Sequence, residues 1–195
     1  DGNGHILDIK GAGGTWDSGI STTGGLIKNI TITGSFRGIF VNHNSDHAEK
    51  VILNNVTIDG PVYTISCDQG TEQGLEAVKS TFNGWTSYAA TIGYVTFTEC
   101  NFGEGAGYAF CRPYAPTVFT NCDFAAGYKI DARAKVTLDN CRLNGVTITA
   151  ENYTSLVTSN AENVAFPANV STSADLAAAL TSGAEKVYLS AGEYT

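Results

Sequence analysis

The sequence predicts an all-β fold: a single-stranded right-handed parallel β-helix, or solenoid, of about seven coils with one short capping α-helix. A short apolar motif recurs along most of the 195 residues, with a period in the low twenties. Three copies of the motif, FTECNF, FTNCDF and LDNCRL, carry a cysteine at the same position. The composition, with 22 glycines and abundant threonine, asparagine and valine, favours strands and turns over helices.

The repeat unit is a short strand that ends near a large apolar residue and leads into a glycine or alanine. Consecutive copies of that apolar residue lie 19 to 26 residues apart, at Ile32, Ile58, Phe82, Phe102, Phe124 and Leu143. This spacing is typical of the coils of a solenoid, in which like residues form vertical files. Asn29 and Asn55 occupy one slot of two copies, so we interpret their Asn-x-Thr sequences as part of the coil rather than as glycosylation sites.

The repeated cysteines predict a buried column of free thiols. Two residues before each apolar marker, the copies place Ile30, Val56, Ser80, Cys100, Cys122 and Cys141. Side chains two apart on a strand share a face, and free cysteine packs as a small apolar residue. A zinc site and disulfide pairing are the alternatives. Zinc ligands cluster around a point, and in-register side chains on parallel strands point the same way, so neither fits the spacing well.

A second strand follows each turn, in GYAFC (107–111), GYKID (127–131) and GVTIT (145–149). Aligned by their apolar residues, these strands place Phe110 over Ile130 and Ile148. Cys67 and Cys111 lie beside this strand, and their role is left open. Because five cysteines cannot all pair, at least one thiol is free.

The last 25 residues differ in character and define a second unit, 171–195, after coils that occupy 1–170. Ser173 is a predicted N-cap, Leu176 and Leu180 share one helix face, and Gly183 suits the position after the helix. An apolar strand follows at 187–189. The sequence therefore predicts a short amphipathic helix followed by a strand.

The segment SADLAAALTSGAEKVYLSAGEYT resembles the N-terminal entry of the pectate-lyase-like right-handed parallel β-helix superfamily. In that family a short helix caps the solenoid before its first coil, whereas here the segment comes last. Three arrangements remain open: the tail covers the chain's own first coil, opens a following β-helix of a tandem array, or covers a neighbouring molecule in head-to-tail self-association. We favour the first, because an uncovered solenoid end exposes unpaired backbone groups.

Proteins of the resembled superfamily include polysaccharide lyases, glycoside hydrolases, adhesins and non-catalytic stalks, so the fold does not decide the function. No run of residues matches a catalytic signature of the family. Counting along the second strand places His43, Asp68 and Arg133 in one outward column, with Arg112 and Asp131 one position to either side. These are the catalytic candidates, since a carboxylate beside histidine and arginine can transfer protons. Such a pattern more commonly indicates a solvated strip of ion pairs.

Aromatic residues provide a non-catalytic interpretation. Sugar faces stack on exposed rings, and NGWTSYAA predicts Trp85 and Tyr88 as the exposed pair that binds a polysaccharide or surface glycan. We expect a non-catalytic extracellular scaffold or adhesion module. The alternative is a polysaccharide lyase or glycoside hydrolase acting on an acidic or plant-type polysaccharide.

The charge balance excludes some classes of partner. A net charge of −8 and a pI near 4.7 argue against nucleic-acid binding, which needs a basic face, and against anionic membrane surfaces. No apolar run approaches the roughly 20 residues that span a bilayer, so we expect no membrane insertion. We predict no metal and no cofactor. The low charge and solenoid class are typical of secreted or cell-surface bacterial proteins.

Overall fold

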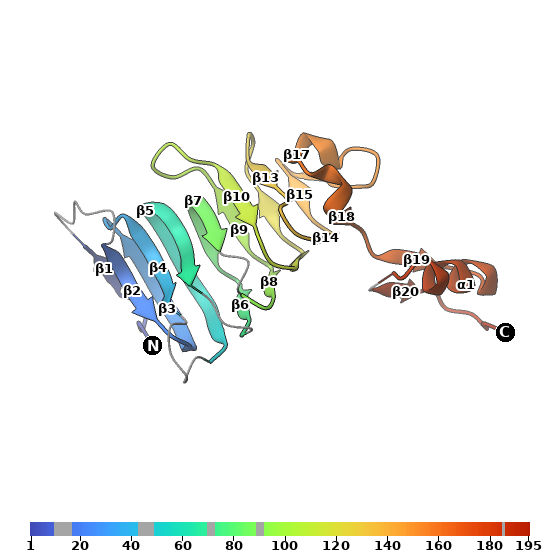
Figure 1. Ribbon diagram of the computed structural model, residues 1–195, viewed down its shortest axis with the longest axis horizontal. Helices are drawn as coiled ribbons and strands as arrows, with labels where there is room; N and C mark the ends of the chain where they lie inside the picture. Colours follow the sequence, from blue (N-terminus) through green and yellow to red (C-terminus); the bar gives the residue numbers. More distant parts are fainter. Residues whose placement is uncertain (10–16, 43–48, 70–72, 89–91, 185) are drawn as a thin grey trace.

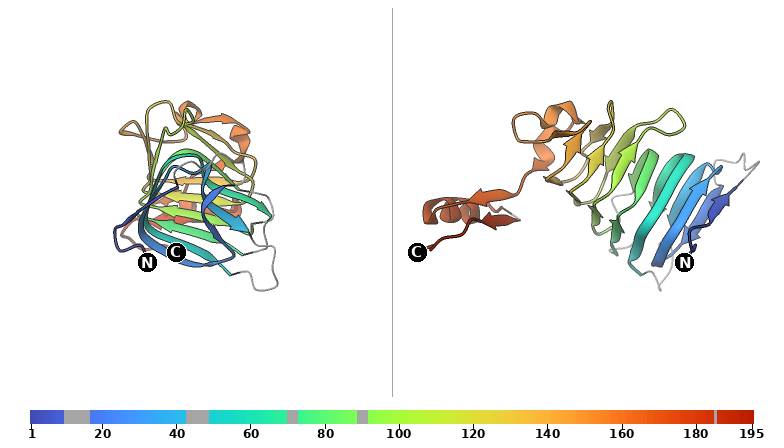
Figure 2. Two further views of the ribbon diagram at one scale, coloured as in Figure 1. Left: turned by 90° about the vertical axis from the view of Figure 1, so that its left-hand side faces the viewer. Right: turned by 180° about the vertical axis from the view of Figure 1, so that it is seen from behind.

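The computed structural model describes residues 1–9, 17–42, 49–69, 73–88, 92–184 and 186–195. It confirms the predicted architecture, a right-handed parallel β-solenoid of about seven coils with a short helix (Figure 1). Viewed along the solenoid, successive coils overlie one another (Figure 2, left). The strands fall into three files that run along the axis.

The first file contains β6 (Leu75–Val78), β8 (Val95–Thr98), β11 (Thr117–Thr120), β14 (Val136–Asp139) and β18 (Val164–Ala165). The second file contains β1 (Ile6–Asp8), β9 (Asn101–Gly103), β12 (Asp123–Phe124) and β15 (Arg142–Leu143). The third file contains β2 (Ser18–Thr22), β4 (Arg37–Asn42), β10 (Phe110–Pro113), β13 (Lys129–Asp131) and β17 (Val157–Ser159). Longer strands pass through more than one file, namely β3 (Gly25–Thr33), β5 (Val51–Gln69) and β7 (Thr81–Tyr88).

Strands of one file pair in parallel with their neighbours, so that like residues overlie one another. Phe119 pairs with Phe97 on one side and with Leu138 on the other. The rings of Phe97 and Phe119 stack with centroids 5.1 Å apart, and those of Phe102 and Phe124 with centroids 5.0 Å apart. These side chains belong to one continuous apolar core that fills the solenoid.

A column of left-handed residues connects the first file to the second. Their φ angles lie between 52° and 55°, at Asn29, Asn55, Lys79, Glu99, Asn121 and Asn140. Asparagine tolerates this conformation better than most residues, and its amide can also bond along the column. Asn140 Nδ2 donates to Asn121 Oδ1 at 2.7 Å, and Asn55 Nδ2 donates to Asn29 Oδ1 at 3.0 Å. The shared slot of Asn29 and Asn55 is therefore a turn position of the coil.

The cysteine column is confirmed. Cys100, Cys122 and Cys141 are buried, and each follows directly after a left-handed residue of the turn. Each thiol donates to a backbone carbonyl of the preceding coil, as Cys141 Sγ does to the oxygen of Phe119 at 3.3 Å. Cys67 and Cys111 are also buried, and all five thiols are free.

The predicted alignment of the third file is wrong at two points. Phe110 pairs with Lys129 rather than with Ile130, one residue away from the expected register. Ile130 in turn pairs with Val157, because the segment predicted to continue the file instead forms β16 (Val146–Thr147), which lies antiparallel to β15. Two short 3-10 helices, η1 (Tyr153–Ser155) and η2 (Ala161–Asn163), flank β17 in this last coil.

The tail is a separate unit made of β19 (Ala168–Val170), α1 (Ser173–Thr181) and β20 (Val187–Leu189), with the two strands paired in parallel. The helix is confirmed, but Thr172 is its N-cap and forms a capping box with Asp175. β19 precedes residue 171 and pairs with β20, so we include it in the tail. Figures 1 and 2 show it beyond the C-terminal end of the solenoid, at the opposite end from β1, so it does not cover the chain's own first coil.

Candidate glycan-binding face

The outward side of the third file carries a ladder of aromatic rings, which we call the aromatic ladder: Phe36, Tyr63, Trp85, Tyr108 and Phe110. Trp85 pairs in register with Tyr63 on one side and with Phe110 on the other. The rings of Tyr63 and Trp85 are stacked, with centroids 5.0 Å apart and planes 29° apart. Trp85 lies 5.4 Å from Tyr108 and 5.6 Å from Phe110, centroid to centroid.

The alternation of each strand explains why these rings face outward. Along β7 the side chains alternate between partly exposed and buried, and Trp85 occupies a partly exposed position. Tyr63 and Phe110 hold the matching outward positions on β5 and β10, and both are partly exposed. Because adjacent coils lie about 4.8 Å apart, outward rings in register are brought into contact.

Two arginines flank the aromatic ladder. The guanidinium of Arg112 lies 5.5 Å from the Trp85 ring centroid and 5.2 Å from that of Phe110. Arg37, at the other end, lies 4.9 Å from the Phe40 centroid and 5.9 Å from that of Tyr63. These are cation–π distances, so both arginines hold the rings in place.

Trp85 also carries an unusual feature. Its indole Nε1 is buried and has no hydrogen-bond partner among the described residues. A buried unpaired donor lowers stability by about 1–3 kcal/mol. Phenylalanine has no such donor and would avoid this cost. The tryptophan therefore gives the face a larger ring at a cost in stability.

The prediction that Tyr88 is exposed is wrong. Tyr88 is 1% exposed, and its hydroxyl lies 2.7 Å from Thr117 Oγ1. Trp85 and Tyr88 are three residues apart on one strand, an odd separation that places their side chains on opposite faces. Trp85 is therefore the outward residue of the predicted pair, and Tyr88 belongs to the core.

Three of the predicted catalytic residues do come together, but as an ion-pair cluster. Asp131 accepts hydrogen bonds from Arg112 Nε at 3.0 Å and Arg133 Nε at 2.8 Å, both on Oδ2. Asn160 Nδ2 donates to its Oδ1 at 2.7 Å. Burial acts to raise the pKa of Asp131, yet the bonds from Arg133, Asn160 and Arg112 outweigh it and lower that pKa below its ordinary value. The cluster thus favours an ionised carboxylate over a proton donor.

The structure does not describe the side chains of the two remaining catalytic candidates. His43 lies outside the described residues, and Asp68 lies on β5 with its side chain outside them. We expected Arg112 and Asp131 one position to either side of the same column, and this is wrong. β13 pairs with β10 one residue away from the expected register, which puts these two residues side by side.

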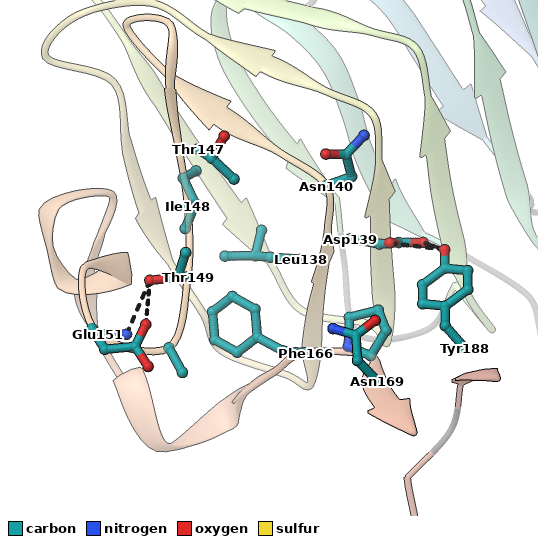
Figure 3. A pocket seen from close by; sticks show the side chains of 12 residues that line it. Leu138, Asp139, Asn140, Thr147, Ile148, Thr149, Glu151, Phe166, Asn169 and Tyr188 are labelled. Atoms are coloured by element: carbon teal, nitrogen blue, oxygen red, sulfur yellow. Dashed lines mark hydrogen bonds between the residues drawn. The ribbon is translucent and has the colours of Figure 1, made fainter. Parts of the chain in front are cut away.

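A cleft of about 480 Å³ lies between the last coil and the tail (Figure 3). Leu138, Ile148 and Phe166 form apolar parts of its lining, and Asp139 and Glu151 provide carboxylates. The Tyr188 hydroxyl bonds to both oxygens of Asp139, at 2.7 and 3.0 Å, and Lys186 pairs with the same carboxylate. These contacts tie the tail to the end of its own solenoid.

Glu151, on the other wall of the cleft, is also engaged. Its carboxylate accepts a hydrogen bond from Thr149 Oγ1, which is the main cause that lowers the pKa of Glu151 below its ordinary value. Asp139 therefore holds the tail, and Glu151 holds the local loop. Sequence analysis did not identify this cleft, because the tail was expected at the first coil.

A scan against protein-family models, a search of curated proteins and a search of solved structures each return no match. The resemblance to the pectate-lyase-like superfamily accordingly stays a prediction. Within the described residues, no group of three or more histidine, cysteine, aspartate or glutamate side chains is arranged to hold a metal ion. No helix in that part of the chain is long and apolar enough to cross a membrane.

Proposed function

We propose that this protein is a non-catalytic glycan-binding module, a secreted or cell-surface bacterial scaffold that binds a polysaccharide along the aromatic ladder. The observation that carries the proposal is the in-register, partly exposed stack of Tyr63, Trp85 and Phe110. Such a stack places the partly exposed sides of several rings along one line, beside which a chain of sugars can lie. Rings bind the apolar faces of sugars, while polar groups at the rim bind their hydroxyls.

The charges favour a neutral polysaccharide. Arg112 is already paired with Asp131, Arg37 is buried, and Lys129 donates from Nζ to the carbonyl of Ser155 at 2.7 Å. These cations next to the ladder are thus engaged by the protein itself. With a net charge of −8, the module would also repel a polyuronate at low ionic strength.

The alternative is the polysaccharide lyase or glycoside hydrolase. It would use Asp131 with Arg112 and Arg133, which do lie together. A glycosidase acid needs a raised pKa, and that of Asp131 is lowered. We therefore favour binding without catalysis.

Affinity electrophoresis tests the proposal with neutral glucans, xylans and mannans and with polygalacturonate as the acidic comparison. We expect binding to at least one neutral polysaccharide, and an affinity about tenfold lower for Trp85→Ala, which corresponds to about 1.4 kcal/mol. Tyr94→Ala is the matched control, because Tyr94 is an exposed tyrosine outside the ladder and should leave binding unchanged.

Product assays on the same samples separate the alternative. Unsaturated products or new reducing ends that disappear in Asp131→Asn would establish an enzyme. Equal affinity of Trp85→Ala and wild type, or no binding to any neutral polysaccharide, would rule out the aromatic ladder as the binding face.

A further inference from the structure

Among the described residues, the first coil of the solenoid has an edge that no strand covers. The described chain supplies β1 for its second file and β2 for its third, but no strand that precedes residues 25–28 in the first file. In the part of the chain that the structure describes, residues 25–28 of β3 pair only with residues 51–54 of β5. Leu26 on this edge is 53% exposed, whereas the equivalent residues of later coils are covered on both sides.

The tail has an open edge of the same kind. β20 pairs with β19 on one side only among the described residues. Leu189 is 56% exposed and Leu180 on α1 is 66% exposed, while Val170 and Ala179 are the buried apolar residues of the described tail. A unit this small with so little buried area gains stability by adding a further surface.

The backbone hydrogen bonds of the two edges are complementary. In parallel pairing, alternate residues bond to opposite neighbours. Gly25 donates to Lys50 of the next coil, which leaves the N–H and C=O of Leu26 facing the open edge. Ser190 donates to Val170 and Ala168 donates to Lys186, so Val187 and Leu189 present their backbone groups on the free edge of β20.

The side chains select the same register. Val51 and Leu53 of β5 are buried in the core, so positions 25 and 27 of β3, which pair with them, face the same side, and Ile27 packs against the core. On β20 the partners of Ala168 and Val170 are Val187 and Leu189, and Val170 is buried. Placing Leu189 beside Ile27 aligns both the inward side chains and the free backbone groups, whereas a slip of one residue breaks both.

We propose that β20 of one molecule supplies the missing first-file strand of a second copy, pairing in parallel with residues 25–28 so that Tyr188 lies beside Leu26. The chain's own first coil lies at the far end of the solenoid from its tail (Figures 1 and 2). The bonds from Tyr188 and Lys186 to Asp139 hold the tail at its own last coil. The tail therefore joins the end of one solenoid to the start of the next.

Such a contact is heterologous, because the two surfaces are different parts of the chain. It does not close on itself unless the rotation per molecule forms a ring, so the expected product is a series of linear oligomers that lengthen with concentration.

Sedimentation velocity of two single-end variants tests this pairing. Leu26→Pro removes the N–H that faces the open edge, and an edge strand tolerates proline where its N–H is unpaired. Leu189→Asp places a charge on the exposed strand of the tail. We expect wild type to form a concentration-dependent ladder of oligomers and each variant alone to sediment as a monomer.

The mixture of the two variants gives the decisive result. Leu26→Pro keeps a working tail and Leu189→Asp keeps a working first coil, so an equimolar mixture should form a dimer and nothing larger. Val146→Asp is the control, because Val146 is an exposed apolar residue away from both edges and this variant should oligomerise like wild type. Circular dichroism checks that each variant is folded, and Leu26→Asp replaces Leu26→Pro if the proline disturbs the coil.

Several outcomes would overturn the proposal. A wild type that stays monomeric at every concentration excludes the second copy as the occupant, and leaves a different protein or a further segment of chain on this edge. Oligomers that persist in both variants place the contact elsewhere. Monomeric variants that fail to form a dimer when mixed contradict the pairing of these two edges.

Discussion

Cys122 and Phe97 lie on neighbouring coils, and the Sγ of Cys122 donates a hydrogen bond to the carbonyl oxygen of Phe97 at 3.4 Å. Cys100 and Cys141 make the equivalent bonds to their own preceding coils. Ser80 occupies the same slot, where its hydroxyl accepts from the N–H of Val56. In these four coils the slot holds a small side chain that fills the core and bonds between coils, a role that suits cysteine, whereas Ile30 and Val56 fill the slot of the earlier coils with apolar side chains.

We predict that the five thiols do not react in the folded protein. All are buried, and burial raises the pKa of the Cys111 thiol so that its reactive thiolate is scarce at neutral pH. A chromogenic disulfide reagent should modify none of them in buffer and all five in denaturant. Rapid modification of any thiol in the native state would show that the core opens locally at that coil.

We predict that Asn121 stabilises the turn in two ways. Its φ of 53° is costly for most residues, and its Oδ1 accepts from Asn140. Asn121→Ala should lower the free energy of unfolding by about 2 kcal/mol, from a left-handed residue and a lost hydrogen bond. Asn121→Gly should lower it by less, because glycine adopts this φ freely. Urea denaturation measures both, and equal losses would mean that the side-chain bond alone matters.

The ion-pair cluster predicts a pH dependence. The pKa of Asp131 is lower in the folded chain than in the unfolded one, so its contribution to stability is present above the unfolded pKa and is lost as pH falls through the folded pKa. Asp131→Asn should therefore be less stable than wild type at pH 7 by about 1–3 kcal/mol. The difference should shrink as pH falls below about 4, the ordinary pKa at which this carboxyl protonates in the unfolded chain.

Thermal unfolding across this pH range checks the prediction. Asp123→Asn is the control, because Asp123 pairs with Arg142 at the surface, where an ion pair contributes about 0–1 kcal/mol. A constant difference between wild type and Asp131→Asn at all pH values would mean that charge plays no part in it.

We predict that a substitution at Trp85 lowers glycan affinity without lowering stability, and that a substitution at Tyr88 lowers stability without lowering affinity. Trp85→Phe removes the unpaired buried Nε1, so its free energy of unfolding should not fall, while its affinity for the polysaccharide should. Tyr88→Phe removes the hydroxyl contact to Thr117 inside the core and should lower stability by about 1 kcal/mol with unchanged affinity. Calorimetry and affinity electrophoresis together measure the split, and a Tyr88→Phe variant that binds more weakly would contradict it.

Prediction from the sequence succeeded where a residue's environment repeats from coil to coil. Phe102, Cys100 and their counterparts were placed in the core because the spacing and alternation of a short strand fix which side chains point inward. The slot of Asn29 and Asn55 was recognised in the same way, although the left-handed φ behind it became visible only in the structure.

Prediction failed where a connection of variable length precedes a strand. The turn between the second and third files is longer before Phe110 than before Lys129, so an alignment by apolar residues slipped by one position. Because of that slip, the alignment did not place Arg112 beside Asp131, although their side chains form an ion pair. The aromatic ladder was missed for the same reason, since Tyr63 and Trp85 align only once the pairing of β5 with β7 is known.

By itself, the sequence determined the solenoid, its thiol column and its helical tail, because each follows from local spacing, strand alternation or capping chemistry. The tertiary structure decided which side chains of different coils meet and where the tail lies. Those relations depend on the register between strands of different coils and on the contacts of Tyr188 and Lys186 with Asp139. Neither is encoded in any short stretch of the chain.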